Sequence, residues 1–180
     1  KKDFVAAYAK ENIMKNSIEI YLNTVSKNFK NLVNNSVQIE DAAKITIQAL
    51  RNKNKIIFCG NGGSASDCQH IAAEFVGKFH KERVSLPAIS LTSDSSVVTA
   101  IANDYGFENI FSRQIQGLAN ENDILFCITT SGNSENITNA LKEAKSRSLK
   151  SILLTSIKVK NAKGLANLEI KVNSKTTARI

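Results

Sequence analysis

The chain has 180 residues, of which 42% are hydrophobic and 22% are charged, which is typical of a folded globular protein and not of a disordered one. That length is enough for one domain with a sizeable core. No apolar run approaches the ~20 residues that a membrane span needs, and no charged and apolar leader precedes the first expected helix. We therefore expect a cytoplasmic protein with no membrane partner.

The formal net charge of +8 raises the question of nucleic-acid binding. The lysines are scattered through the chain, however, and no exposed aromatic residues alternate with them as they do in single-strand binders. We expect no nucleic-acid partner. The positive charge is better explained by solubility and by attraction for anionic metabolites.

The three cysteines, Cys59, Cys68 and Cys127, are odd in number and lack the spacing of a metal-binding pair. Two of them lie within apolar runs that resemble strands. Free cysteine commonly behaves as a small buried hydrophobe, so we expect reduced core thiols.

The N-terminal part of the chain has a helical pattern. Apolar residues recur at steps of three and four over residues 3–34, and again over residues 39–51, with a break at Asn34, Asn35 and Ser36. These two helices predict an N-terminal helical extension over residues 1–52.

From residue 53 onward, short apolar runs alternate with helical stretches. Strands that are apolar on both faces and alternate with helices predict a three-layer α/β fold with a doubly wound parallel sheet. We expect residues 53–180 to form one structural unit. The expected strands are residues 56–59, 88–91, 124–128, 151–154 and 168–172, and the expected helices are residues 64–79, 97–103, 111–119 and 134–146.

Two of the strand-to-helix junctions are unusually polar and small. The glycine-rich segment, residues 60–66, follows the first strand, and the hydroxyl-rich segment, residues 129–134, follows the third. Ligands of open parallel sheets bind at the carboxyl ends of the strands, and helix N-termini favour anions. Either segment alone could be merely a turn in which a serine caps the helix. Two of them together favour a phosphate site.

A nucleotide is not the expected ligand. Gly60 and Gly62 fit the start of the dinucleotide fingerprint, but Ala65 stands where its third glycine belongs. Asp94, the nearest acidic residue that could hold a ribose, lies beyond the expected offset. No lysine follows the glycines, which excludes a P-loop.

His70 and Glu74 are four residues apart and therefore share one face of the predicted helix. Such a pair can bind a metal or act as an acid/base unit, although an ordinary surface pair has the same spacing. Its position soon after the glycine-rich segment predicts that it faces the same crevice. Asn103 and Asp104 form a further polar turn, which alone indicates only turn chemistry.

Four stretches of the chain together resemble the phosphoheptose isomerases, a family of the sugar-isomerase (SIS) superfamily. The similarity extends over nearly the whole chain, although the last of these stretches alone marks only the superfamily. They read G-N-G-G-S-A-S-D-C-Q-H-I-A-A-E-F-V-G, L-P-A-I-S-L-T, A-I-A-N-D-Y-G-F-E-N-I-F-S-R-Q and T-T-S-G-N-S.

The resemblance implies conversion of sedoheptulose 7-phosphate to D-glycero-D-manno-heptose 7-phosphate through an enediol, for the heptose of bacterial lipopolysaccharide or capsule. It also implies a homotetramer with sites at subunit interfaces, and a zinc ion held by His70 and Glu74. Glu74 would also be the catalytic base. The substrate contacts that it implies are Asn61, Gly62, Gly63, Ser64, Glu74, Asn103, Asp104, Thr129, Thr130, Ser131 and Ser134.

Two features depart from the family pattern. The resemblance implies a further helix after T-T-A-R-I that supplies a glutamine and a histidine to the site, so we expect a chain that ends at Ile180 to be a poor enzyme. Residues 156–161 also replace an expected glycine-rich turn.

The alternative function is a non-catalytic SIS-domain protein, either initiator-associating or sugar-phosphate-sensing. Such regulators usually carry a helix-turn-helix domain, which the N-terminal helices do not resemble.

Overall fold

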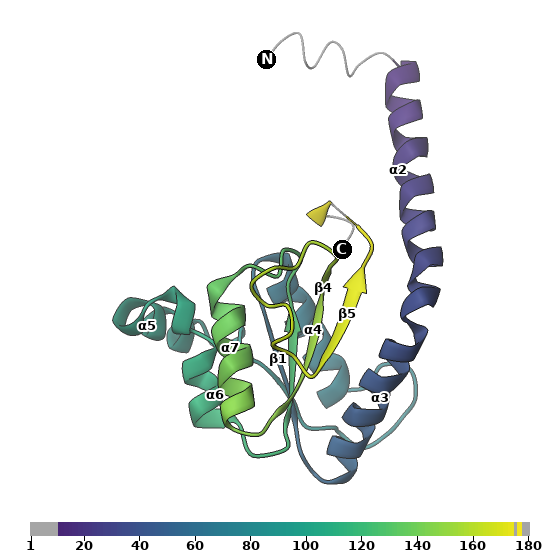
Figure 1. Cartoon of the computed structure of the whole chain (residues 1–180). Coiled ribbons are helices and arrows are strands. Elements are labelled where there is room, and N and C mark those ends of the chain that lie inside the picture. The colour runs from purple at the N-terminus through teal and green to yellow at the C-terminus, as the bar shows by residue number, and fades with distance from the viewer. Residues whose placement is uncertain (1–10, 175, 178–180) are drawn as a thin grey trace.

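The computed structural model describes residues 11–174 and 176–177 (Figure 1). Helix α2 (Glu11–Asn31) leads through a short 3-10 turn, η1 (Leu32–Asn35), into helix α3 (Ser36–Arg51). The predicted break is confirmed, but α3 begins at Ser36 instead of residue 39. Residues 3–10 of the first predicted helix, and residues 178–180 at the end of the stretch that resembles the family, lie outside the described residues.

The centre of the molecule is a five-stranded sheet in the order β2-β1-β3-β4-β5, with every neighbouring pair parallel. The predicted three-layer α/β fold with a doubly wound parallel sheet and an N-terminal helical extension is confirmed. The strands are β1 (Ile56–Gly60), β2 (Ala88–Ser90), β3 (Ile124–Ile128), β4 (Lys150–Ser156) and β5 (Leu168–Val172), and the helices between them are α4 (Gly63–Val76), α5 (Ser95–Tyr105), η2 (Phe107–Asn109), α6 (Ser112–Leu118) and α7 (Glu135–Ser146).

Side chains of successive strand residues point to opposite faces, so the sheet has a core on each side. Ile57, Leu125 and Leu153 are buried with residues of α6 and α7 on one face. Ile56 and Phe58 are buried with residues of α3 and α4 on the other. Figure 1 shows α6 and α7 on one side of the sheet and α3 on the other, while α2 extends past the sheet.

Helix α4 ends at Val76, although the apolar pattern predicted helix to residue 79. Arg83 explains the early end. Its guanidinium donates hydrogen bonds to the backbone carbonyls of Glu74 at 2.6 Å, Phe75 at 2.9 Å and Gly77 at 3.3 Å. An arginine in this place satisfies the last carbonyls of the helix, so the chain can leave it there.

Asp123 ties the amino ends of β1 and β3 together. Its carboxylate is 1% exposed and accepts hydrogen bonds from the backbone nitrogens of Lys55 at 2.9 Å and Asn120 at 2.7 Å. The Lys55 ammonium lies 2.5 Å from the same carboxylate. A buried charge that is both paired and hydrogen-bonded is a stable arrangement, and this one anchors both strands at their start.

All three cysteines are free and buried, as predicted. The Sγ atoms of Cys59 and Cys127 lie 3.4 Å apart across β1 and β3. Burial raises the pKa of the Cys68 thiol, so this residue behaves as part of the core. Within the described ranges, no helix is long and apolar enough to cross a membrane.

Candidate functional site

The two predicted ligand-binding segments meet at the point where the strand order reverses. β1 pairs with β2 on one side and with β3 on the other. Gly60 at the end of β1 is in register with Ile128 at the end of β3, so the segments that follow begin side by side. Open α/β sheets bind ligands at such a switch point, outside the carboxyl ends of the strands.

The glycine-rich segment, residues 60–66, makes the tight connection between β1 and α4. A Cβ atom on Gly60 would lie 2.8 Å from the carbonyl oxygen of Ser64, so only glycine allows this approach. Gly62 has φ 57° and ψ −121°, which also favours glycine, and it is the N-cap residue with no side-chain cap hydrogen bond. The alternative of a turn in which a serine caps the helix therefore does not apply to α4, and Ser64 lines a groove.

The hydroxyl-rich segment, residues 129–134, folds back on itself between β3 and α7. The backbone nitrogen of Gly132 donates to Thr129 Oγ1 at 3.2 Å, and that of Asn133 donates to Ser131 Oγ at 3.2 Å. Each hydroxyl thus accepts one bond and keeps its own proton to donate. Ser134 is the N-cap residue of α7 but makes no side-chain cap hydrogen bond. Thr129 and Thr130 line the groove at the end of β3, whereas Ser131 and Ser134 do not.

The loop after β4, which includes residues 156–161, is hydrogen-bonded to this segment. The backbone nitrogen of Ala162 donates to Gly132 O at 2.9 Å, and that of Asn161 donates to Asn133 Oδ1 at 3.3 Å. Gly132 has φ 65°, and a Cβ there would clash with the side chain of Val159. The loop after β4 therefore packs closely against the hydroxyl-rich segment.

Asn61 and Asn136 join the two segments, and the sequence reasoning missed the second of them. Each side-chain amide donates to the oxygen of the other, at 2.9 Å in both directions. Asn61 follows β1, and Asn136 lies in the first turn of α7 and is 3% exposed. A reciprocal amide pair thus spans the switch point.

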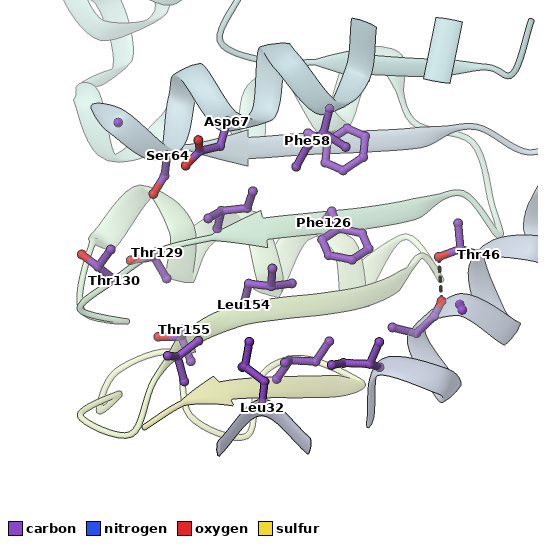
Figure 2. Close-up of a pocket in the computed structure, with 18 of the residues that line it drawn as sticks. Leu32, Thr46, Phe58, Ser64, Asp67, Phe126, Thr129, Thr130, Leu154 and Thr155 are labelled. Atoms are coloured by element: carbon purple, nitrogen blue, oxygen red, sulfur yellow. Dashed lines mark hydrogen bonds between the residues drawn. The ribbon is translucent and has the colours of Figure 1, made fainter. Parts of the chain in front are cut away.

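A groove of about 1350 Å³ runs along the sheet face from this polar end toward α2 and α3. Figure 2 shows the hydroxyls of Ser64, Thr129 and Thr130 at one end of it, with Phe58 and Phe126 further along. The two phenyl rings lie 5.5 Å apart between centroids. The groove therefore combines a polar end with a long apolar floor.

Two further polar residues stand at the polar end of the groove. Asp67 is exposed and extends from α4 near Ser64, one helical turn after the glycine-rich segment (Figure 2). Thr155, at the end of β4, is 1% exposed, and its hydroxyl oxygen has no hydrogen-bond partner. The three-residue step from Ser64 could have pointed to Asp67, but nothing in the apolar run of β4 distinguishes Thr155.

His70 and Glu74 lie on α4, as predicted, with Nε2 and Oε1 3.6 Å apart and side chains 73% and 33% exposed. The residues of α4 that line the groove are Gly63, Ser64, Asp67, Ile71 and Phe75. The predicted pair lies on the adjoining side of the same helix, beside the groove and not within it.

A metal ion at this pair would have only part of the ligand set it needs. A catalytic zinc usually has three protein ligands. Among the described residues, no group of three or more histidine, cysteine, aspartate or glutamate side chains could hold a metal ion. His70 and Glu74, an imidazole and a carboxylate within 3.6 Å, have the right chemistry for two ligands.

Asn103 and Asp104 stand apart from the two segments. They lie at the end of α5, both exposed, and Asn103 Nδ2 donates to Asp104 Oδ1 at 2.8 Å. Neither lines the groove. The structure of this single chain therefore brings the two strand-end segments together but leaves the polar turn outside.

Comparison with known proteins shows which family the chain is similar to. The family model described as the SIS domain matches residues 20–156. A phosphoheptose isomerase of Nitratiruptor sp. is 54% identical over 142 residues, which cover 79% of this chain and 76% of that protein. A phosphoheptose isomerase of Sulfurimonas denitrificans is 43% identical, and the alignment covers 96% of this chain and 86% of the relative.

Two solved structures support the same family assignment. The structure of a phosphoheptose isomerase from Francisella tularensis superimposes with a TM-score of 0.88 at 37% identity, covering 92% of this chain and 89% of that one. The corresponding enzyme from Neisseria gonorrhoeae gives a TM-score of 0.80 at the same identity and coverage.

Proposed function

Because this chain belongs to the phosphoheptose isomerases of the SIS-domain family, we propose that it is an isomerase that converts sedoheptulose 7-phosphate to D-glycero-D-manno-heptose 7-phosphate. The observation that carries the proposal is the meeting of the glycine-rich and hydroxyl-rich segments at the strand-order switch point. The reaction takes place in the cytoplasm, and its product supplies the heptose of bacterial lipopolysaccharide or capsule.

The hydroxyl-rich segment holds the phosphate. Thr129 and Ser131 donate their hydroxyl protons, Thr130 and Ser134 add two more hydroxyls, and the start of α7 adds its partial positive charge. The phosphate does not react; its binding energy orients the sugar for proton transfer. The sugar then extends along Asn61, Gly62, Gly63 and Ser64. Asn103 and Asp104, which lie outside the groove of the single chain, contact its hydroxyls in the assembled tetramer.

Glu74 moves the proton between C1 and C2. Converting a ketose to an aldose moves one proton from C1 to C2 through an enediol and a second proton from O1 to O2. A carboxylate is suited to the carbon proton, and a second acid/base group transfers the oxygen proton. Glu74 lies in the last turn of α4, the helix that begins at the glycine-rich segment. Arg83 holds the backbone of that turn through the Glu74 carbonyl.

His70 and Glu74 would supply two ligands to a zinc ion, and further ligands would come from outside the described residues. A bound zinc ion would stabilise the negative charge that develops on the substrate oxygens. The 3.6 Å separation of His70 Nε2 and Glu74 Oε1 supports this assignment.

The working enzyme is a homotetramer with sites at subunit interfaces. Two features of the chain support association. Large apolar side chains of α2 are exposed, among them Ile20 at 66% and Phe29 at 68%. The apolar floor of the groove is also longer than a sugar phosphate requires. Light scattering coupled to size-exclusion chromatography tests the oligomeric state, and a monomer at micromolar concentration would contradict it.

The test of the function is Glu74→Gln, which preserves size and removes basicity. Turnover of sedoheptulose 7-phosphate should fall by about 10²–10⁴-fold, the contribution of a positioned general base. The variant should still bind the substrate by calorimetry and should stop exchanging the C1 proton with deuterated water. Metal content, measured in parallel, separates the loss of a base from the loss of a metal ligand.

Glu121→Gln is the matched control, since Glu121 is exposed and lies at the opposite, amino end of the strands. It should turn over at the wild-type rate. Glu74→Gln with near wild-type turnover would show that Glu74 is not the base, and wild-type protein that neither binds nor isomerises the substrate would overturn the function.

A further inference from the structure

The reciprocal pair of Asn61 and Asn136 is a closed arrangement. Each amide uses one N–H and one oxygen lone pair on the other, at 2.9 Å in both directions. A side-chain amide has two N–H groups and two acceptor lone pairs, so each partner keeps one of each. If either side-chain amide rotated by half a turn, its N–H would face the other N–H and its oxygen would face the other oxygen. The pair therefore fixes the orientation of both.

The two partners differ in what they can reach. Asn136 is 3% exposed within the first turn of α7, so its remaining groups face the protein. Asn61 is half-buried and lines the groove beside Ser64. Only Asn61 can therefore offer its second N–H and second lone pair to a ligand in the groove.

The pair also sets the spacing of the two segments. Asn61 belongs to the glycine-rich segment, whereas Asn136 begins the helix that follows the hydroxyl-rich segment. Below them, the ladder between β1 and β3 ends at Gly60 and Ile128. Beyond that point, the amide pair is a direct side-chain link between the two segments.

We propose that Asn136 is a positioning residue: it orients the Asn61 amide toward the substrate and holds the glycine-rich and hydroxyl-rich segments at one spacing. The inference rests on the proposed function, in which Asn61 contacts the sugar phosphate. Asn136 itself does not touch the substrate. Because Asn136 acts through Asn61, its positioning role can be distinguished by experiment from a purely structural one.

The test is a double-mutant cycle with sedoheptulose 7-phosphate as the probe, measured by calorimetry and by steady-state turnover. Asn136→Ala should weaken substrate affinity about tenfold, the effect of one lost hydrogen bond, and should raise KM more than it lowers kcat. Asn61→Ala should weaken affinity at least as much. The double variant should lie within about twofold of Asn61→Ala, because a residue that acts through another has no effect once that residue is gone.

Asn136→Leu is a second variant that retains side-chain volume and removes both hydrogen bonds, and it should behave as Asn136→Ala does. Asn139→Ala is the matched control, because Asn139 lies on the same helix and donates to the Glu108 carbonyl at 3.1 Å. It should bind substrate with wild-type affinity.

Independent effects, in which the double variant loses about a hundredfold, would overturn the inference, as would wild-type affinity in both Asn136 variants. Loss of the folded circular-dichroism spectrum in both variants would assign Asn136 to stability alone and also overturn it. If the wild-type chain itself neither binds nor isomerises the substrate, the proposed function fails and the inference fails with it. A wild-type chain that binds the substrate, together with unaffected Asn136 variants, removes the inference only.

Discussion

The two ends of the sheet are built in opposite ways. At the amino end, Asp123 is buried, paired with Lys55, and hydrogen-bonded to two backbone nitrogens. At the carboxyl end, Ser134 stands at the N-cap of α7 without a side-chain cap bond, and the buried Thr155 hydroxyl has no partner. The polar groups at the start of these strands thus have hydrogen-bond partners, whereas some polar groups at the carboxyl end do not.

The difference separates stability from function within one sheet. Buried polar groups are normally satisfied, and exceptions gather where a ligand or a reaction supplies the missing partner. Two buried side-chain atoms in the described residues lack a partner, Thr155 Oγ1 and Gln38 Oε1, and the first stands in the groove beside the switch point. The amino end should therefore tolerate substitution poorly, and the carboxyl end should tolerate it at the expense of binding.

Removal of the amino-end anchor should have the largest effect on stability. Asp123→Ala leaves the backbone N–H groups of Lys55 and Asn120 without their acceptor and removes a buried ion-pair partner. We expect a loss of about 3–5 kcal/mol in the free energy of unfolding, measured by urea denaturation.

Asp67→Ala is the matched control at the other end of the sheet, since Asp67 is exposed. Its free energy of unfolding should change by less than about 0.5 kcal/mol. Similar losses in the two variants would remove the distinction between the two ends.

The hydroxyl-rich segment should show the reverse behaviour, with an effect on binding and little on stability. Ser131→Ala and Ser134→Ala should each weaken the binding of sedoheptulose 7-phosphate by about 1.5–3 kcal/mol, the value of a hydrogen bond to a charged group. Inorganic phosphate should compete with the substrate in the wild type. Calorimetric titration measures both quantities.

Ser146→Ala is the control for these variants. Ser146 ends α7, the helix that begins after the hydroxyl-rich segment, and its hydroxyl donates to the Glu143 carbonyl at 2.8 Å. Because it lies at the negative end of the helix dipole, it should not affect the affinity. Unchanged affinity in the Ser131 and Ser134 double variant would exclude the segment as the phosphate site.

Local patterns in the sequence predicted most of the fold. The strands at residues 124–128 and 168–172 have the predicted bounds, because short apolar runs between turn residues indicate them directly. Both polar segments follow their strands as predicted. The end of α4 was misplaced because it depends on Arg83, which returns to the helix from a later loop.

The partners of single polar residues could not be predicted in this way. Asn136 and Asp123 read as an ordinary helix asparagine and an ordinary turn aspartate. Each acquires its role from a residue that is distant in sequence, 75 positions away for Asn136 and 68 for Asp123. The order of strands, which places β1 beside β3, is also absent from periodicity. The sequence thus predicted which loops carry the site, but it did not predict the side-chain hydrogen bonds that link these loops.

Substitution of Thr155 should have the smallest effect of these variants on the measured free energies, and the sign of that effect distinguishes the two ends of the sheet. Thr155→Val replaces a buried hydroxyl that has no partner with a methyl group of the same shape. Replacing an unsatisfied group removes its desolvation penalty, so the free energy of unfolding should rise by about 1–2 kcal/mol. Thr155→Ser is the control, because it preserves the hydroxyl and should show no gain. A protein that becomes more stable when its carboxyl end is made apolar carries there a polar group that the fold itself does not use. If Thr155→Val is destabilising instead, the hydroxyl already has a partner, and the carboxyl end is as saturated as the end that Asp123 anchors.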